Sequence, residues 1–136
     1  MKKFIMVLCT VILCLTCTTV AFANFRASDQ IDGYEIDISK KGNGNISIYF
    51  LVESNSNMDY LGAENIVIDR QSGENWIRVA SYDRNDYGLS RKNAKRFENN
   101  VVFSGTSGVR YRVEVTIFAE NASGYDSRTK TAFVTA

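Results

Sequence analysis

The chain has 136 residues and a nearly balanced charge, with 16 Lys and Arg against 15 Asp and Glu and a net charge of +1. This balance does not favour binding to nucleic acid or to an anionic membrane surface. The chain contains no histidine and no proline, and its three cysteines all lie near the N-terminus, at Cys9, Cys14 and Cys17.

The N-terminal segment, residues 1–23, has the three parts of a secretory signal peptide. A basic start is followed by an uncharged stretch to Val20 and by the small-x-small motif Ala21-Phe22-Ala23. We expect cleavage between Ala23 and Asn24, which leaves residues 24–136 as one secreted, extracellular domain. An uncleaved anchor is the alternative, but the apolar stretch is short for a spanning helix of about 20 residues.

All three cysteines belong to this predicted signal peptide. The mature chain can therefore form no disulfide and no thiolate metal site, and a hydrophobic core must hold it together. Lipid attachment at Cys17 is the alternative to plain secretion, because Leu15-Thr16-Cys17 is similar to a bacterial lipobox. Thr16, however, stands where a smaller residue is usual, so plain secretion is the favoured interpretation.

Short alternating apolar runs, separated by polar turns, predict the first strands of an all-β sandwich. The run 33–39 is expected to place Tyr34, Ile36 and Ile38 on one face, and Lys41–Gly44 is a strong turn signal. The next run, 45–53, has apolar residues at alternate positions on the expected core face, at Ile46, Ile48, Phe50 and Val52.

The middle of the chain predicts a loop and then a hairpin. Ser54–Met58 is polar and is expected to be a loop. Residues 64–70, with Ile66 and Ile68 on one face, and residues 76–82 are expected to pair around a turn at Gln71–Glu74.

Residues 83–99 differ from the rest because they are polar, mixed in charge and without a clear period. We expect a long loop here, and loops of this length are either functional or poorly ordered. A short helical turn over Ser90–Phe97 is compatible with the spacing of its apolar residues. Residues 100–104 then predict a short strand, and an alternating hairpin from Val109 to Val134 closes the sheet, which makes seven strands.

From Ile66 onward this order resembles a fibronectin type III or immunoglobulin-like sandwich. The features that carry the resemblance are the Ile66-Val67-Ile68 strand, Trp76, Tyr111-x-Val113-x-Val115 and Ala119-x-Asn121-x-x-Gly124. The resemblance implies a seven-stranded antiparallel sandwich, with Trp76 in the core and Tyr111 as the corner tyrosine near the start of the penultimate strand. Tyr111 lies two residues further from Ala119 than that family usually places it.

The layout that includes Met58-Asp59-x-Leu61-Gly62-Ala63 is also similar to a group of short exported proteins of Gram-positive, Clostridia-like bacteria. That similarity implies secretion and the sandwich. It transfers no functional residue.

The residue types that most catalytic sites need are missing. Without histidine or a mature cysteine, the chain lacks the commonest general base, the commonest metal ligand and the thiol nucleophile. A glycosidase needs two facing carboxylates about 5–9.5 Å apart, and a sandwich of this size has little room for such a cleft. We therefore expect no enzyme activity, no cofactor and no metal. A small hydrolase that uses carboxylates alone is the least favoured alternative.

The segment Asp83–Gly88 has Asp, Asn and Gly at the first, third and sixth places of a calcium-binding loop. Tyr87 and Ala94, however, stand at two further places where that loop needs oxygen ligands. An ordinary Asp- and Asn-rich turn is the favoured interpretation.

The loop predicted over residues 83–99 is the first candidate for a partner site, because tyrosine and arginine make good interface anchors. The candidate residues in and beside it are Tyr82, Tyr87, Arg91, Lys92 and Arg96. Acidic residues in the same segment dilute its charge, so a solvated loop that neutralises itself is the alternative, and the charge pattern favours that alternative.

Phe118 is the second candidate, because it falls on the strand face opposite the expected core, as do Tyr49 and Leu51. If their strands are neighbours, the three form an exposed apolar patch able to bind a partner. A covered sheet face and a register shifted by one residue are the alternatives.

The functional hypothesis from the sequence is a secreted, non-catalytic binding module for a surface glycan, a peptide or a host protein. Its partner would be a protein or a carbohydrate rather than nucleic acid, and no segment after Val20 is long and apolar enough to span a membrane. The alternative is a structural matrix or envelope component that associates with itself through a free strand edge.

Overall fold

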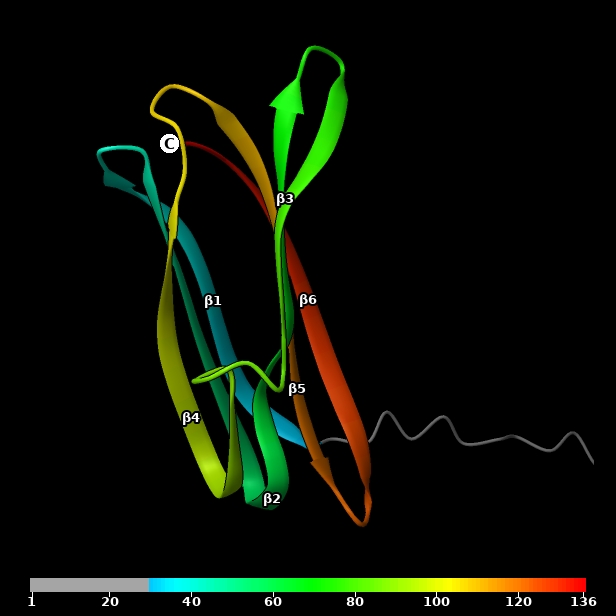
Figure 1. Ribbon diagram of the computed structural model, residues 1–136. Coiled ribbons are helices and arrows are strands. Elements are labelled where there is room, and N and C mark those ends of the chain that lie inside the picture. Colours follow the sequence, from blue (N-terminus) through cyan, green and yellow to red (C-terminus); the bar gives the residue numbers. More distant parts are fainter. Residues whose placement is uncertain (1–29) are drawn as a thin grey trace, which may run out of the picture.

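The computed structural model describes residues 30–136, which form an all-β antiparallel fold without a helix (Figure 1). The predicted signal peptide and its cleavage site at Ala23 and Asn24 lie outside the described residues. The six strands are β1 (Ile31–Gly42), β2 (Asn45–Ser72), β3 (Asn75–Asp83), β4 (Ser90–Ser104), β5 (Arg110–Asn121) and β6 (Gly124–Thr135). No helix in residues 30–136 is long and apolar enough to cross a membrane.

The strands form one strongly curled sheet that folds into two facing layers (Figure 1). The first half of β2 pairs with β1 on one side and with β4 on the other. The second half of β2 pairs with β3 on one side and with β5 on the other, and β6 continues this layer beyond β5. Strand β2 therefore belongs to both layers and connects them.

The predicted loop at Ser54–Met58 is wrong, because the chain bends there without leaving the sheet. The pairing of β2 with β4 shifts register between Glu53 and Met58, so the intervening residues bulge out of the strand pair opposite Lys95. The Ser54 hydroxyl donates to the carbonyl oxygen of Lys95 at 3.0 Å, and the side chain of Met58 is buried. Bulges bend strands, so two predicted strands are one long strand and the structure has six strands instead of seven.

The apolar side chains at alternate positions of β2 and β5 fill the space between the layers. The predicted core residues of the first half of β2 are all fully buried, namely Ile46, Ile48, Phe50 and Val52, and so are Ile66 and Ile68 of the second half. Strand β5 contributes Val113, Val115 and Ile117. These predictions are confirmed. Tyr34 shares the face of Ile36 and Ile38, as predicted, but it is 53% exposed near the start of β1.

Trp76 is not a core residue, contrary to the prediction from the resemblance. It lies opposite Gln71 in the β2–β3 pairing, and its ring centroid is 5.5 Å from that of the exposed Phe133. The register shift at Ile68/Asp69 explains the difference, because an extra residue in β3, Val79, moves Trp76 to the outer face of its layer.

The prediction for Tyr111 is confirmed by its position and its hydrogen bond. Its ring is buried near the start of β5, 5.5 Å from the ring of Phe103, and its hydroxyl accepts a hydrogen bond of 2.8 Å from the backbone N–H of Thr106. The hydroxyl therefore ties the start of β5 to the turn that precedes it.

Replacing Tyr111 by phenylalanine is expected to lower the free energy of unfolding by about 0.5–1.5 kcal/mol, because it removes this hydrogen bond and keeps the ring. Urea denaturation of both proteins measures the difference. Tyr34→Phe is the matched control, since Tyr34 is exposed, and it should have no measurable effect. Equal midpoints for all three proteins would contradict the role given to the Tyr111 hydroxyl.

Candidate functional site

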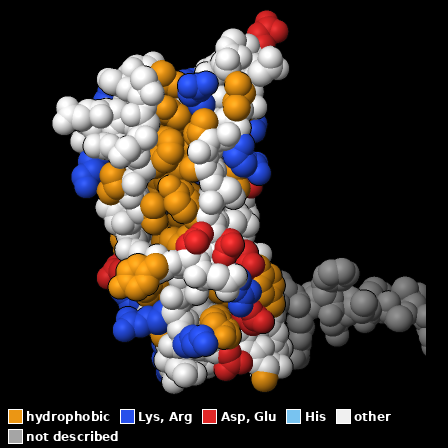
Figure 2. All heavy atoms as spheres, in the orientation of Figure 1, with side chains coloured by type: hydrophobic (Ala, Val, Ile, Leu, Met, Phe, Trp, Pro, Cys, Tyr) orange, Lys and Arg blue, Asp and Glu red, His pale blue; other side chains and the backbone are white. Residues whose placement is uncertain are grey.

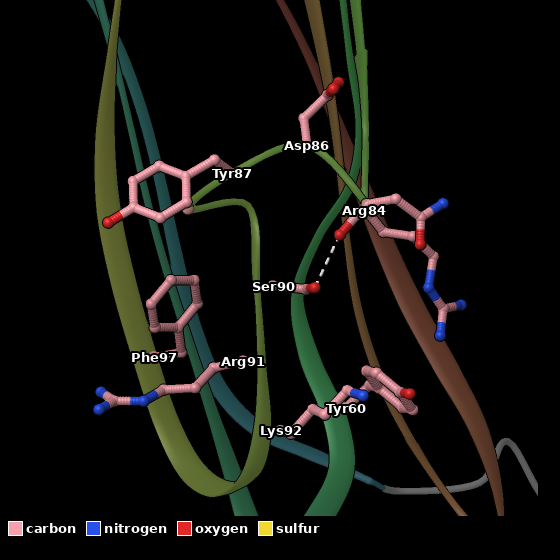
Figure 3. Close-up of a pocket in the computed structure, with 10 residues that line it drawn as sticks. Tyr60, Arg84, Asp86, Tyr87, Ser90, Arg91, Lys92 and Phe97 are labelled. Atoms are coloured by element: carbon pink, nitrogen blue, oxygen red, sulfur yellow. Dashed lines mark hydrogen bonds between the residues drawn. The ribbon is translucent and has the colours of Figure 1, made fainter.

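An open pocket of about 510 Å³ lies beside the turn that connects β3 to β4 (Figure 3). Its walls come from this turn, from the start of β4 and from the second half of β2. The lining residues that carry rings or cationic groups are Tyr60, Tyr87, Phe97, Arg84, Arg91 and Lys92.

The turn that forms one wall is much shorter than the loop predicted over residues 83–99. Only residues 84–89 lie between the two strands, and Ser90–Ser104 is strand β4, so the predicted helical turn over Ser90–Phe97 is wrong. These residues are polar because they belong to a strand that pairs with β2 on one edge only and is largely exposed on its outer face. Strands that face solvent on one side can carry many polar residues, and such a polar segment without a clear period predicts a loop from the sequence.

Hydrogen bonds within the turn fix its shape. The carboxylate of Asp83 accepts a hydrogen bond of 2.8 Å from the backbone N–H of Asn85, and Asp86 accepts one of 2.8 Å from the N–H of Asp83. The acidic side chains therefore bind backbone groups of their own turn. In the part of the chain that the structure describes, no three His, Cys, Asp or Glu residues form a group able to hold a metal ion.

Leu89 anchors the end of the turn in the core. Its side chain is 2% exposed, and its carbonyl oxygen accepts a hydrogen bond of 2.7 Å from the N–H of Ala63 on β2. The amide of Asn99 donates to the carbonyl oxygen of Gly88 at 2.6 Å, and the Ser90 hydroxyl donates to that of Arg84 at 2.7 Å (Figure 3). The pocket wall is thus pre-organised by bonds to both neighbouring strands.

Arg84 is already engaged within the protein. Its guanidinium forms ion pairs with Glu64 at 3.2 Å and Glu120 at 2.6 Å, and it lies 4.2 Å from the ring centroid of Phe118. Burial lowers the pKa of Arg84, but the hydrogen bond to Glu120 and the charges of both carboxylates outweigh it, so the pKa is above its ordinary value. Arg84 therefore stabilises the structure of the site, and its positive charge is already paired with Glu64 and Glu120.

Arg91 and Lys92 are the cations of the pocket that remain available to a ligand. Within residues 30–136, neither lies within 4 Å of a carboxylate oxygen. The ammonium group of Lys92 lies 5.1 Å from the ring centroid of Tyr60, at cation–π distance. Tyr87 is fully exposed at the rim. The pocket therefore combines two available cations with aromatic surfaces.

Arg96 has a different position from the one predicted. It pairs with Glu53 at 2.6 Å and with Glu98 at 3.2 Å, and it lines a smaller hollow beside the pocket. The hydrogen bond from the Tyr49 hydroxyl, followed by that from Arg96, lowers the pKa of Glu98, and the same bond to Glu98 raises the pKa of Tyr49. Arg96, Glu98 and Tyr49 therefore form a surface network that satisfies its own charges.

Phe118 is not exposed, and of the alternatives left open by the sequence the covered sheet face is the one that the structure has. It is on the face of β5 opposite the core, as expected, but its exposed fraction is 0%. The guanidinium of Arg84 covers its ring, and Tyr125 stacks beside it with ring centroids 6.1 Å apart. The exposed patch of Phe118, Tyr49 and Leu51 therefore does not form. Phe118 is covered, and Tyr49 and Leu51 lie in the first half of β2, which pairs with β1 and β4 and not with β5.

Tyr82 also lies outside the pocket, because it packs half-buried against the core. Figure 2 shows an apolar strip along the front of the molecule between the two layers. Half-buried apolar side chains of β3 and β4 pack against the core, among them Tyr82, Ala80, Phe97, Val101 and Phe103.

Of the six candidate residues, the structure brings together Tyr87, Arg91 and Lys92. The sequence missed Tyr60 and Phe97, whose rings complete the pocket. The sequence predicts no strand over residues 59–63, and it predicts a loop around Phe97. The alternation of Met58, Tyr60 and Gly62 is too short a pattern to predict the bend of β2 that brings Tyr60 beside β4.

No family model matches the chain, and no curated protein matches it. Among solved structures it is similar to the solution structure of CsgH from R. palustris. That similarity has 14% identity and a TM-score of 0.37 over 71% of this chain and 87% of that chain.

Proposed function

We propose that this protein is a secreted, non-catalytic binding module, and that the pocket beside the β3–β4 turn takes an acidic glycan. The observation that carries the proposal is the pairing of available cations with rings, because Lys92 stands beside Tyr60, while Arg91 projects to the other side of β4, where Phe97 and the exposed Tyr87 lie (Figure 3). Carboxylate or sulfate groups of a sugar would bind the cations, and its apolar faces would pack on the rings.

The size and rigidity of the pocket support a small ligand unit. Sites for small molecules enclose about 300–1,000 Å³, and this one has about 510 Å³. Its wall is held by the hydrogen bonds of the 84–89 turn, so little ordering would be needed on binding.

We also propose that the fold is of the fibronectin type III and immunoglobulin-like kind. Counting the two halves of β2 separately gives seven strand segments, three in one layer and four in the other. The corner tyrosine Tyr111 supports the same assignment. Such a fold carries many functions, so the proposed function rests on the pocket and not on the fold.

The double variant Arg91→Gln/Lys92→Gln tests the glycan proposal. We expect the wild-type protein to bind oligogalacturonate or dextran sulfate but not neutral dextran, and the variant to bind at least about tenfold more weakly, a loss that corresponds to 1.4 kcal/mol. Isothermal titration at low and high salt measures both, and salt should weaken binding because exposed charges are screened.

The control is Lys41→Gln/Arg70→Gln, which removes the same charge from exposed positions near two other turns. This control should bind like the wild type. Binding to neither acidic polymer, or an equal loss in both double variants, would contradict a specific site in the pocket.

A further inference from the structure

The outer face of the second layer carries a cluster of cationic and aromatic side chains, called here the arginine cluster: Arg78, Arg110, Arg112, Trp76 and Phe133. Four residues on four strands form one row across the layer, in the order Arg78, Asp69, Arg112 and Phe133. Arg112 lies 5.1 Å from the ring centroid of Trp76, and Arg110 lies 5.1 Å from that of Phe133.

Asp69 at the centre of this row holds two arginines in place. It is buried, and it accepts hydrogen bonds from Arg112 at 2.7 Å and from Arg78 at 3.3 Å. Burial raises the pKa of Asp69, but the hydrogen bonds from the two guanidinium groups outweigh it and leave the pKa below its ordinary value. Glu114 lines the same hollow and forms no ion pair with either arginine within residues 30–136, so the three arginines of the cluster face two carboxylates, and the Arg78 side chain remains 61% exposed.

Arg78 belongs to β3, which in the described residues pairs with a strand on one edge only. The β2–β3 hairpin projects beyond the other strands (Figure 1), and Ile77 and Val79 are exposed on β3. An edge of this kind, rich in apolar residues and with a single lysine or arginine, is open to pairing with another strand.

The other edges are protected in ways that β3 is not. The edges of β1 and β6 lie against each other, where Lys130 donates to the carbonyl oxygen of Ile36 at 2.6 Å and Asp126 accepts from the N–H of Ile31 at 3.4 Å. The edge of β4 carries four lysines or arginines from Arg91 to Arg96, and Asn93 within this segment has a positive φ of 50°. Several charges along an edge block edge pairing, and β3 carries a single lysine or arginine.

We infer that β3 is a docking edge for an acidic peptide segment of a partner protein, which adds to the sheet as an extended strand. A strand beside β3 continues the row of Arg78, Asp69 and Arg112, so its side chain in that row is the cross-strand neighbour of Arg78. A carboxylate there meets the surplus positive charge. Apolar side chains of the same strand pack beside Trp76 on one face and Ile77 on the other.

A second copy of this chain fits the edge less well. Arg78 lies near the middle of β3, so two β3 strands paired antiparallel around a two-fold axis bring their Arg78 side chains close together. Like charges at opposite positions destabilise a strand pair. The bulge at Val79 shortens the regular edge, which favours a short peptide over a long strand pairing.

The test is a titration of the isotopically labelled protein with an alternating Glu/Val peptide of about eight residues, followed by amide chemical shifts. We expect shifts along residues 75–83 and at Asp69 and Arg112, and none with a Lys/Val peptide of the same length. Arg78→Glu should weaken binding of the acidic peptide at least about tenfold and allow the basic peptide to bind. Arg78→Gln, a milder change, should lower affinity for the acidic peptide alone.

The Arg91→Gln/Lys92→Gln variant should bind the acidic peptide like the wild type, so that failure of the glycan proposal and failure of this one are distinguishable. The absence of shifts at millimolar peptide, or equal binding of acidic and basic peptides, would overturn the inference. Shifts in β3 that depend on protein concentration without peptide would assign the edge to a second copy and overturn it as well.

Discussion

Replacing Gly62 by alanine is expected to lower the free energy of unfolding by at least about 3 kcal/mol. Gly62 has a φ of +150°, which L side chains rarely adopt, and a Cβ built on it would lie 2.1 Å from the carbonyl oxygen of Leu89. The obstacle is backbone, held by the hydrogen bond from Ala63 to Leu89, so it has no flexible end that can move aside. Urea denaturation followed by circular dichroism measures the loss.

Gly73→Ala is the matched control for this prediction. Gly73 also has a positive φ, of +60°, but no atom lies within 4 Å of its Cβ position. It should cost about 1–2 kcal/mol from backbone strain alone. If the two variants are equally destabilised, the β3–β4 turn does not cross β2 at Gly62 as the structure has it.

Replacing Phe118 by alanine is expected to cost about 3 kcal/mol or more, within the range for buried phenylalanines. The ring is fully buried although it lies opposite the core, because Arg84 and Tyr125 cover it. The variant also removes the surface on which Arg84 rests, so Arg84 should become more mobile. Denaturation midpoints measure the first effect, and side-chain relaxation of Arg84 measures the second.

Phe133→Ala is the control, because Phe133 is an outward phenylalanine of the same layer that is 54% exposed. It should cost about 1 kcal/mol or less. A cost for Phe118→Ala as small as that of Phe133→Ala would mean that Phe118 is exposed in solution, which is one of the alternatives that the sequence alone leaves open.

The sequence predicted well where a strand has one face in the core. Ile46, Ile48, Phe50 and Val52 are buried as expected, because period-two alternation follows directly from strand geometry. The closing hairpin also matches, since the side chain of Asn121 accepts a hydrogen bond of 2.8 Å from the N–H of Ser123 in its turn. These features are local, and local geometry determines them.

The sequence predicted poorly where contacts with distant segments determine the local structure. Ser90–Asn99 forms a strand only because the first half of β2 offers an edge to pair with. Trp76 faces outward because of a bulge opposite Ile68 and Asp69, and a shift of one residue reverses the face of every side chain beyond it. No pattern within these segments indicates either outcome.

In the candidate site, too, some features follow from local sequence and others depend on long-range contacts. Tyr87, Arg91 and Lys92 were identified from composition, because exposed cations and rings close together in sequence are visible without a structure. The engagement of Arg96 by Glu53 and that of Arg84 by Glu120 depend on contacts between residues more than 30 positions apart, which only the fold creates.

The sequence by itself therefore determined the all-β class and the core faces of the regular strands, since alternation and turn chemistry act over a few residues. The tertiary structure decided which cations remain available, which aromatic residues are covered and which strand edge is free. These properties depend on long-range pairing and on side chains from other strands, as the cover of Arg84 over Phe118 illustrates.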